Sequence, residues 1–135
     1  MKSLMICLLM LAPLAVFAQD NPGTQQSVAT VNGDQLKSWY DQKKPMVVLD
    51  ARTKEYFDGK LLPDAKWLPY NSSEDAIRAA APSKDGLIVV YCWGPECPAS
   101  GMLAHKLQSM GYTNIYEYRG GVQEWKQKGY PIDQK

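Results

Sequence analysis

From Val28 onward, the chain alternates between short apolar runs and longer segments in which apolar residues recur three and four positions apart. Short apolar runs bounded by turn residues are typical of buried strands, and the second pattern is typical of one face of a helix. The runs predict five strands, at residues 28–31, 46–50, 65–68, 87–91 and 115–118.

Helices are expected between these strands. In the first of them Leu36, Trp39 and Tyr40 form an apolar face, and we expect Asp34 to be its N-cap. The residues 72–75, Ser-Ser-Glu-Asp, resemble a capping box for another helix. The expected helices lie between residues 34 and 45, over 54–58, over 72–81, over 98–110 and over 122–128.

Alternating strands and helices predict an α/β domain with a five-stranded, mainly parallel sheet and helices on both faces. The chain has 135 residues, which suits one domain with its own core. In such sheets ligands bind beyond the carboxyl ends of the strands. The residues that end the strands are therefore the candidates for a site.

Cys92 directly follows the apolar run 87–91, and Gly94 and Pro95 after it cannot continue a strand. Pro98 is suited to the first position of the helix that follows. A helix N-terminus favours an anion, so a thiol held there has a lowered pKa and acts as a nucleophile. The two alternatives are a buried structural cysteine and a disulfide between Cys92 and Cys97.

Three charged residues follow other predicted strands and could share a pocket with Cys92. Asp50 and Arg52 follow the second strand, and Arg119 follows the fifth, before Gly120. We expect Asp50 to brace the neighbouring loops. Arg52 fits a structural ion pair as well as a role in the site.

The remaining candidates for special chemistry are few. His105, the one histidine, lies off the apolar face of its helix, so we expect it to be solvated. With so few histidines and cysteines, a closed zinc site lacks ligands, and no metal is expected. Trp93 is a candidate for the mouth of the pocket. The other tryptophans are expected in the core: Trp39, Trp67 and Trp125.

The start of the chain predicts export. Lys2 precedes an apolar run from Leu4 to Phe17, with small residues before a cut after Ala18. We therefore expect a signal peptide at residues 1–18, a flexible arm at 19–27 and the folded domain at 28–135, located in the periplasm. The apolar run is too short to span a membrane. An oxidising compartment would permit a disulfide.

Charge excludes some partners. The formal net charge is +1, and removal of Lys2 with the signal peptide takes it to zero. Such a protein has no net electrostatic attraction to nucleic acid or anionic lipid. We expect a monomer that binds neither nucleic acid nor, after cleavage, a membrane.

The motifs, in their order along the chain, resemble those of the rhodanese family of sulfurtransferases. The resemblance runs from about Val28 to Pro131 and rests on residues 48–53 with 55–56 and 59, on 63–65, on 89–92, on 111–116, and on 120–121 with 125 and 129–131. It implies that Cys92 carries a sulfane sulfur as a persulfide, taken from a small sulfur compound and passed to a thiol or a cyanide-type acceptor, with no metal or organic cofactor. It assigns a persulfide-binding loop made of Trp93, Gly94, Pro95, Glu96, Cys97 and Ser100.

This sequence departs from the family pattern in three places. Lys60 stands where the family often has a histidine, the loop after Cys92 is about two residues longer, and Glu96 brings a negative charge into it. That charge opposes an anionic donor, so thiosulfate is not expected as the physiological donor.

Two other functions stay open: a thiol–disulfide redox protein that uses Cys92 and Cys97, and a non-catalytic binding module. A further hypothesis gives Cys97 a protective role. Cys97 would attack a Cys92 persulfide, release sulfide and close a disulfide.

Overall fold

The structure is a computed structural model and describes residues 27–135. The predicted signal peptide and residues 19–26 of the predicted arm lie outside these described residues. Within the described part, no helix is long and apolar enough to cross a membrane.

Five parallel strands form the central sheet, in the spatial order β1-β6-β5-β2-β4. The three inner strands are β2 (Val47–Asp50), β5 (Ile88–Tyr91) and β6 (Ile115–Tyr118). The two edge strands, β1 (Ala29–Thr30) and β4 (Lys66–Trp67), are shorter. The predicted α/β fold with a five-stranded parallel sheet is confirmed. Because all strands run the same way, their carboxyl ends meet at one edge.

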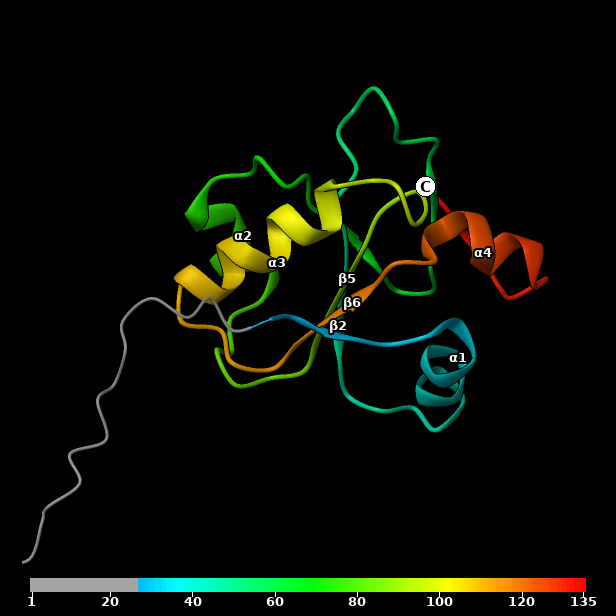
Figure 1. The fold of residues 1–135 in the computed structure, drawn as a ribbon, viewed down its shortest axis with the longest axis horizontal. Coiled ribbons are helices and arrows are strands. Elements are labelled where there is room, and N and C mark those ends of the chain that lie inside the picture. Colours follow the sequence, from blue (N-terminus) through cyan, green and yellow to red (C-terminus); the bar gives the residue numbers. More distant parts are fainter. Residues whose placement is uncertain (1–26) are drawn as a thin grey trace, which may run out of the picture.

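Two helices pack on each face of the sheet (Figure 1). α2 (Glu74–Ala80) and α3 (Ala99–Ser109) cover one face, and α1 (Gly33–Asp41) and α4 (Gly121–Gln127) cover the other. Successive residues of β5 alternate between the two cores: Ile88 and Val90 pack under α3, whereas Val89 and Tyr91 pack under α4. All four are buried, which explains the continuous apolar run.

The N-terminal caps of α1 and α2 can be compared with the residues expected from the sequence. The N-cap of α2 is Ser73, which lies within the segment 72–75 that resembles a capping box, and its hydroxyl accepts a hydrogen bond from the N–H of Ala76. The prediction of Asp34 as the cap of α1 was wrong, because Asn32 accepts the bond from Gln35 at 2.8 Å. Asp34 instead lies in the first turn and pairs with Lys128 at 2.7 Å.

Residues 54–56 form a turn and residues 57–58 are irregular, so the predicted helix over 54–58 was wrong. A segment of this length gains few helical hydrogen bonds for the cost of nucleation. The side chain of Arg52 binds it instead, through the carbonyl of Tyr56 and the carboxylate of Asp58. The chain then forms a short antiparallel pair, β3 (Lys60–Leu61) with β7 (Asp133–Gln134), which no periodic pattern predicted.

The predicted core tryptophans lie in different surroundings. Trp125 is fully buried and contacts Tyr118 and Tyr130 edge to face. Trp39 is partly buried under the same face of the sheet. Trp67 is 38% exposed, so its prediction as a core residue was wrong. Trp67 lies on an edge strand, where its ring stacks on Phe57 at 4.6 Å.

Candidate active site

Cys92 lies at the carboxyl end of β5, and the loop that follows it leads to the N-terminus of α3. The start of α4 holds the backbone of this loop. The carbonyls of Cys92 and Trp93 accept hydrogen bonds from the N–H groups of Val122 and Gln123 at 3.1 and 2.9 Å. Gly121 has a positive φ of 64°, and a Cβ there would lie 2.6 Å from the Cys92 carbonyl oxygen. Glycine is therefore required for this close approach.

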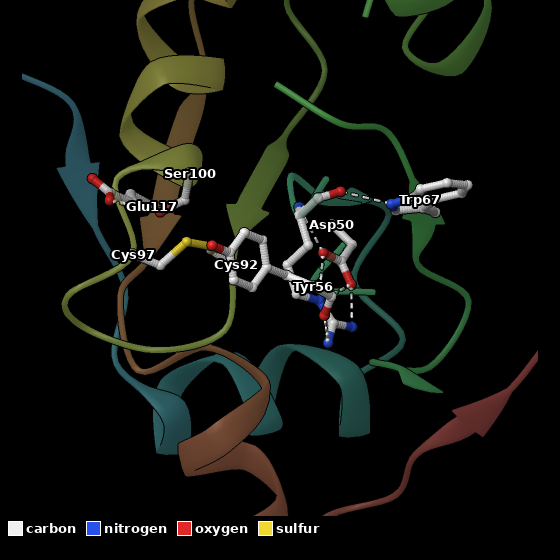
Figure 2. Close-up of a disulfide and its surroundings, with 8 residues drawn as sticks. Asp50, Tyr56, Trp67, Cys92, Cys97, Ser100 and Glu117 are labelled. Atoms are coloured by element: carbon white, nitrogen blue, oxygen red, sulfur yellow. Dashed lines mark hydrogen bonds and ion pairs between the residues drawn. A yellow bond between two sulfur atoms is a disulfide. The ribbon is translucent and has the colours of Figure 1, made fainter. Parts of the chain in front are cut away.

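Cys92 and Cys97 form a disulfide, with their Cα atoms 6.1 Å apart (Figure 2). From the sequence alone, both a free Cys92 thiol and this disulfide were possible. A turn supports the link, because the N–H of Cys97 donates to the carbonyl of Gly94 at 3.1 Å. The disulfide spans a separation of only five residues. By the loop-entropy argument, a disulfide that closes so short a loop adds only about 2 kcal/mol to the free energy of unfolding. Its contribution to stability is therefore modest.

The disulfide lines a cavity of about 450 Å³. Tyr56, Trp93 and Met102 are exposed around it, so its surroundings are strongly apolar. Its lining residues come from the loops after β2 and β5 and from the start of α3: Arg52, Thr53, Tyr56, Tyr70, Cys92, Trp93, Glu96, Cys97, Pro98, Ala99 and Met102.

The predicted site residues are only partly brought together. Those that line the cavity are Cys92, Trp93, Glu96, Cys97 and Arg52, whereas Gly94, Pro95, Ser100, Asp50 and Arg119 are not among its lining residues. Arg119 is exposed, and its Nε lies 3.5 Å from Glu117. His105 is exposed, in agreement with the predicted solvated position, and it does not line this cavity.

Asp50 and Arg52 form a fully buried ion pair beside the cavity, with Nη2 and Oδ2 2.6 Å apart. The remaining N–H groups of Arg52 bind Asp58 and the carbonyls of Tyr56 and Lys60. Asp50 also accepts a bond from the backbone N–H of Arg52. This is the bracing role predicted for Asp50. All the N–H groups of the Arg52 guanidinium are bound within the protein, so none is free to bind a substrate.

Asp58 extends this network to the surface. Partial burial opposes its charge, but hydrogen bonds from Lys126 and from the N–H of Lys60, with the charge of Arg52, lower the pKa of Asp58 to about 2. Tyr91 closes the other side of the network: its hydroxyl accepts from the N–H of Leu62 at 3.1 Å. Burial, reinforced by the charge of Asp50, raises the pKa of Tyr91, so this hydroxyl stays protonated.

Sequence reasoning missed Glu117, a buried acid on β6. Its Oε1 accepts a hydrogen bond from the hydroxyl of Ser100 in the first turn of α3, at 2.9 Å. In the view of Figure 2 this pair lies above the disulfide, and Asp50 lies to the right of it. The available signal was a single acid within the otherwise apolar and aromatic run 115–118. Such a residue in a buried strand requires a partner.

The cavity carries little positive charge. Among its lining residues, all within the described range, Arg52 is the single cationic side chain, and Asp50 and Asp58 neutralise it. Glu96 is exposed in the lining and adds a negative charge. Residues 27–135 contain no group of three or more histidine, cysteine or acidic side chains that could hold a metal. The sulfur atoms that line the cavity belong to Cys92, Cys97 and Met102.

Comparison with known proteins identifies the fold and the family. A sequence model of the Rhodanese-like domain matches residues 32–128. A crystal structure of a Bacillus halodurans protein superposes with a TM-score of 0.70 at 23% identity, covering 78% of this chain and 77% of that one. At this identity the likeness shows the fold alone.

Two relatives are named as sulfurtransferases. The adenylyltransferase and sulfurtransferase UBA4 of Candida albicans is 36% identical over 62% of this chain, and this chain spans 20% of that protein's length. A sulfurtransferase of Allochromatium vinosum is 27% identical over 78% of this chain and 94% of its own length. Together with the family match, these names support sulfur transfer in general.

The Asp58→Asn variant tests the charge network. The pKa of Asp58 is about 2, below its ordinary value of 3.8, so the charged carboxylate stabilises the folded state above pH 3.8. That contribution is lost as the pH falls through the folded value. We expect the variant to have a lower free energy of unfolding at neutral pH and to approach the wild type as the pH falls to about 2 and below, as measured by urea unfolding across pH.

The control is Asp75→Asn, which removes an exposed ion pair with Arg78. It should change stability little at any pH, because exposed pairs contribute little. If the two variants gave the same pH profile, the network around Arg52 would not control the charge of Asp58.

Proposed function

The chain belongs to the rhodanese-like domain family, and from this we propose that it is a sulfurtransferase that carries sulfane sulfur as a persulfide on Cys92. The observation that supports this most directly is the position of Cys92. Cys92 follows the buried strand β5, lines the cavity and precedes the N-terminus of α3. Sulfur transfer requires a nucleophilic sulfur at such a point, with space beside it for a small donor.

In the proposed reaction, the Cys92 thiolate attacks the sulfane sulfur of a donor and forms a new S–S bond. The bond between that sulfur and the rest of the donor breaks, and the remainder leaves with the electron pair. An acceptor thiolate or a cyanide-type acceptor then attacks the outer sulfur of the persulfide. Cys92 leaves as thiolate and is ready for another cycle.

The surrounding structure supports an anion on Cys92. The first turn of α3 has N–H groups without partners in the helix, and its dipole presents partial positive charge there. α3 has 11 residues and begins directly after Pro98. The bonds from Val122 and Gln123 to the loop carbonyls hold the Cys92 backbone in place.

The disulfide restricts this reaction to the reduced protein, because Cys92 has no free thiol while it is bonded to Cys97. A reductant must therefore open the bond before a sulfane donor can react. The same disulfide also supports the second candidate function, a thiol–disulfide redox protein. The two functions differ in whether Cys97 is indispensable, since sulfur transfer requires one cysteine only.

The protein is further proposed to be exported and cleaved after Ala18. The basic start, the apolar run and the small residues before Gln19 support this. A periplasmic location would also suit a disulfide at the site. The proposed partners are a small sulfur compound and a thiol acceptor.

Substitution of each cysteine tests the proposed function. With reduced protein and a thiosulfonate donor, Cys92→Ser should abolish sulfur transfer, while Cys97→Ser should still transfer and should hold the persulfide longer. Mass spectrometry of the protein and of the acceptor measures both. An active Cys92→Ser and an inactive Cys97→Ser would mean that Cys97 is the nucleophile. If both variants failed in a disulfide reductase assay that the wild type passes, the redox function would be favoured.

Glu96→Gln tests the effect of charge on the choice of donor. Removing the carboxylate from the cavity lining should raise the rate with thiosulfate more than the rate with a neutral thiosulfonate, and added salt should reduce the difference. The control is Asp85→Asn, which removes a charge at the opposite end of β5. Equal effects of Glu96→Gln on both donors would mean that this carboxylate does not act on the substrate.

Export can be tested on the protein recovered from cells. Fractionation and N-terminal sequencing should find it in the periplasm with Gln19 as its first residue. A protein that retained Met1 and stayed in the cytoplasm would contradict the proposal.

A further inference from the structure

The disulfide gives the cavity a second kind of reactivity. When Cys92 is bonded to Cys97, its sulfur is an electrophile rather than a nucleophile. We propose that the oxidised protein accepts hydrosulfide directly, so that sulfide itself supplies the Cys92 persulfide. This inference rests on the proposed function only in taking Cys92 as the sulfur carrier.

The reaction balances without any further reagent. Hydrosulfide attacks Sγ of Cys92 and forms a new S–S bond with it. The bond between Cys92 and Cys97 breaks, and Cys97 leaves as a thiolate with the electron pair. The products are a persulfide on Cys92 and a reduced Cys97. The disulfide is therefore the oxidant, because it takes two electrons from the sulfide sulfur.

The local structure favours Cys97 as the leaving group. Cys97 lies one residue before Pro98, the N-cap of α3. A thiolate released at this helix end is stabilised by the partial positive charge of the first turn, and a stabilised thiolate leaves faster. The same helix end also favours an anion on Cys92, but Cys97 is the nearer of the two along the chain, so its departure, with attack on Cys92, is the direction assisted.

Burial selects a small nucleophile. Cys92 is 2% exposed, whereas Cys97 is partly exposed. A bulky thiol such as glutathione can therefore reach Cys97 more readily than Cys92. Hydrosulfide has a single heavy atom and can approach Cys92 through the cavity that both cysteines line. The expected result is size selection, with sulfide loading Cys92 and larger thiols merely opening the disulfide.

The charge of the cavity favours the same substrate. Arg52 is neutralised by acidic partners, Glu96 adds negative charge, and Tyr56, Trp93 and Met102 give apolar surroundings. A divalent anion gains little there. Hydrogen sulfide exchanges between a neutral and a monoanionic form near neutral pH, so it can enter in the neutral form and react as the anion.

The experiment uses one protein in two redox states. Oxidised wild type receives one equivalent of isotopically labelled sulfide under exclusion of oxygen, followed by an alkylating agent and peptide mapping by mass spectrometry. Because Cys97 can attack the persulfide in the reverse step, the alkylating agent is added promptly; the expected result is labelled sulfur on the Cys92 peptide of the trapped chains, with Cys97 alkylated there as a free thiol. Reduced wild type, which lacks the oxidant, should take up no label.

A parallel sample separates this inference from the proposed function. Reduced wild type is treated with a thiosulfonate, and a persulfide on Cys92 there supports the proposed function whatever sulfide does. The inference is overturned if the oxidised protein yields no labelled sulfur, or if the label lies on the Cys97 peptide. As a second check, Cys97→Ser cannot form the disulfide and should take up no label from sulfide.

Discussion

The buried ion pair of Asp50 and Arg52 fixes the edge of the sheet on which the cavity is built. Fully buried charges are tolerated when they are paired and hydrogen-bonded, and removing one partner of such a pair typically costs about 3–5 kcal/mol. Here Arg52 also binds the carbonyls of Tyr56 and Lys60, so the pair shapes the loop that brings Tyr56 to the cavity. The cavity beside Cys92 is thus shaped by a contact that lies away from its sulfur.

A second constraint comes from α4, which covers the face of the sheet that carries Val89 and Tyr91. The start of α4 packs so closely on the loop after Cys92 that Gly121 cannot carry a side chain without a clash. The N–H groups of Val122 and Gln123, in the first turn of α4, donate hydrogen bonds to the carbonyls of Cys92 and Trp93. Two helix starts therefore act on one loop in different ways: α4 binds its backbone, and α3 begins directly beyond the second cysteine.

The parts of the fold that were predicted correctly are those in which apolar residues recur at a regular spacing along the sequence. The inner strands and the main helices follow apolar spacing, and Cys92 was found because it ends a strand. Residues 54–58 were mispredicted because the partner of their backbone is the side chain of Arg52, a tertiary contact. β3 and β7 are too short to show any pattern. Trp67 lies on an edge strand, so its ring is partly exposed to solvent, and the hydrophobicity of the residue alone does not predict this exposure.

The state of the site was less predictable than its location, because it depends on distances between side chains. Whether Cys92 and Cys97 can bond depends on how closely the loop brings Cys97 back to Cys92, and the turn through Gly94 supports that approach. The consequence is chemical. In the proposed function, Glu96 acts against anionic donors, and the redox state of the cysteine pair sets which sulfur compounds can react. In the proposed function the reduced pair offers a nucleophile to sulfane sulfur, and in the further proposal the oxidised pair offers an electrophile to sulfide.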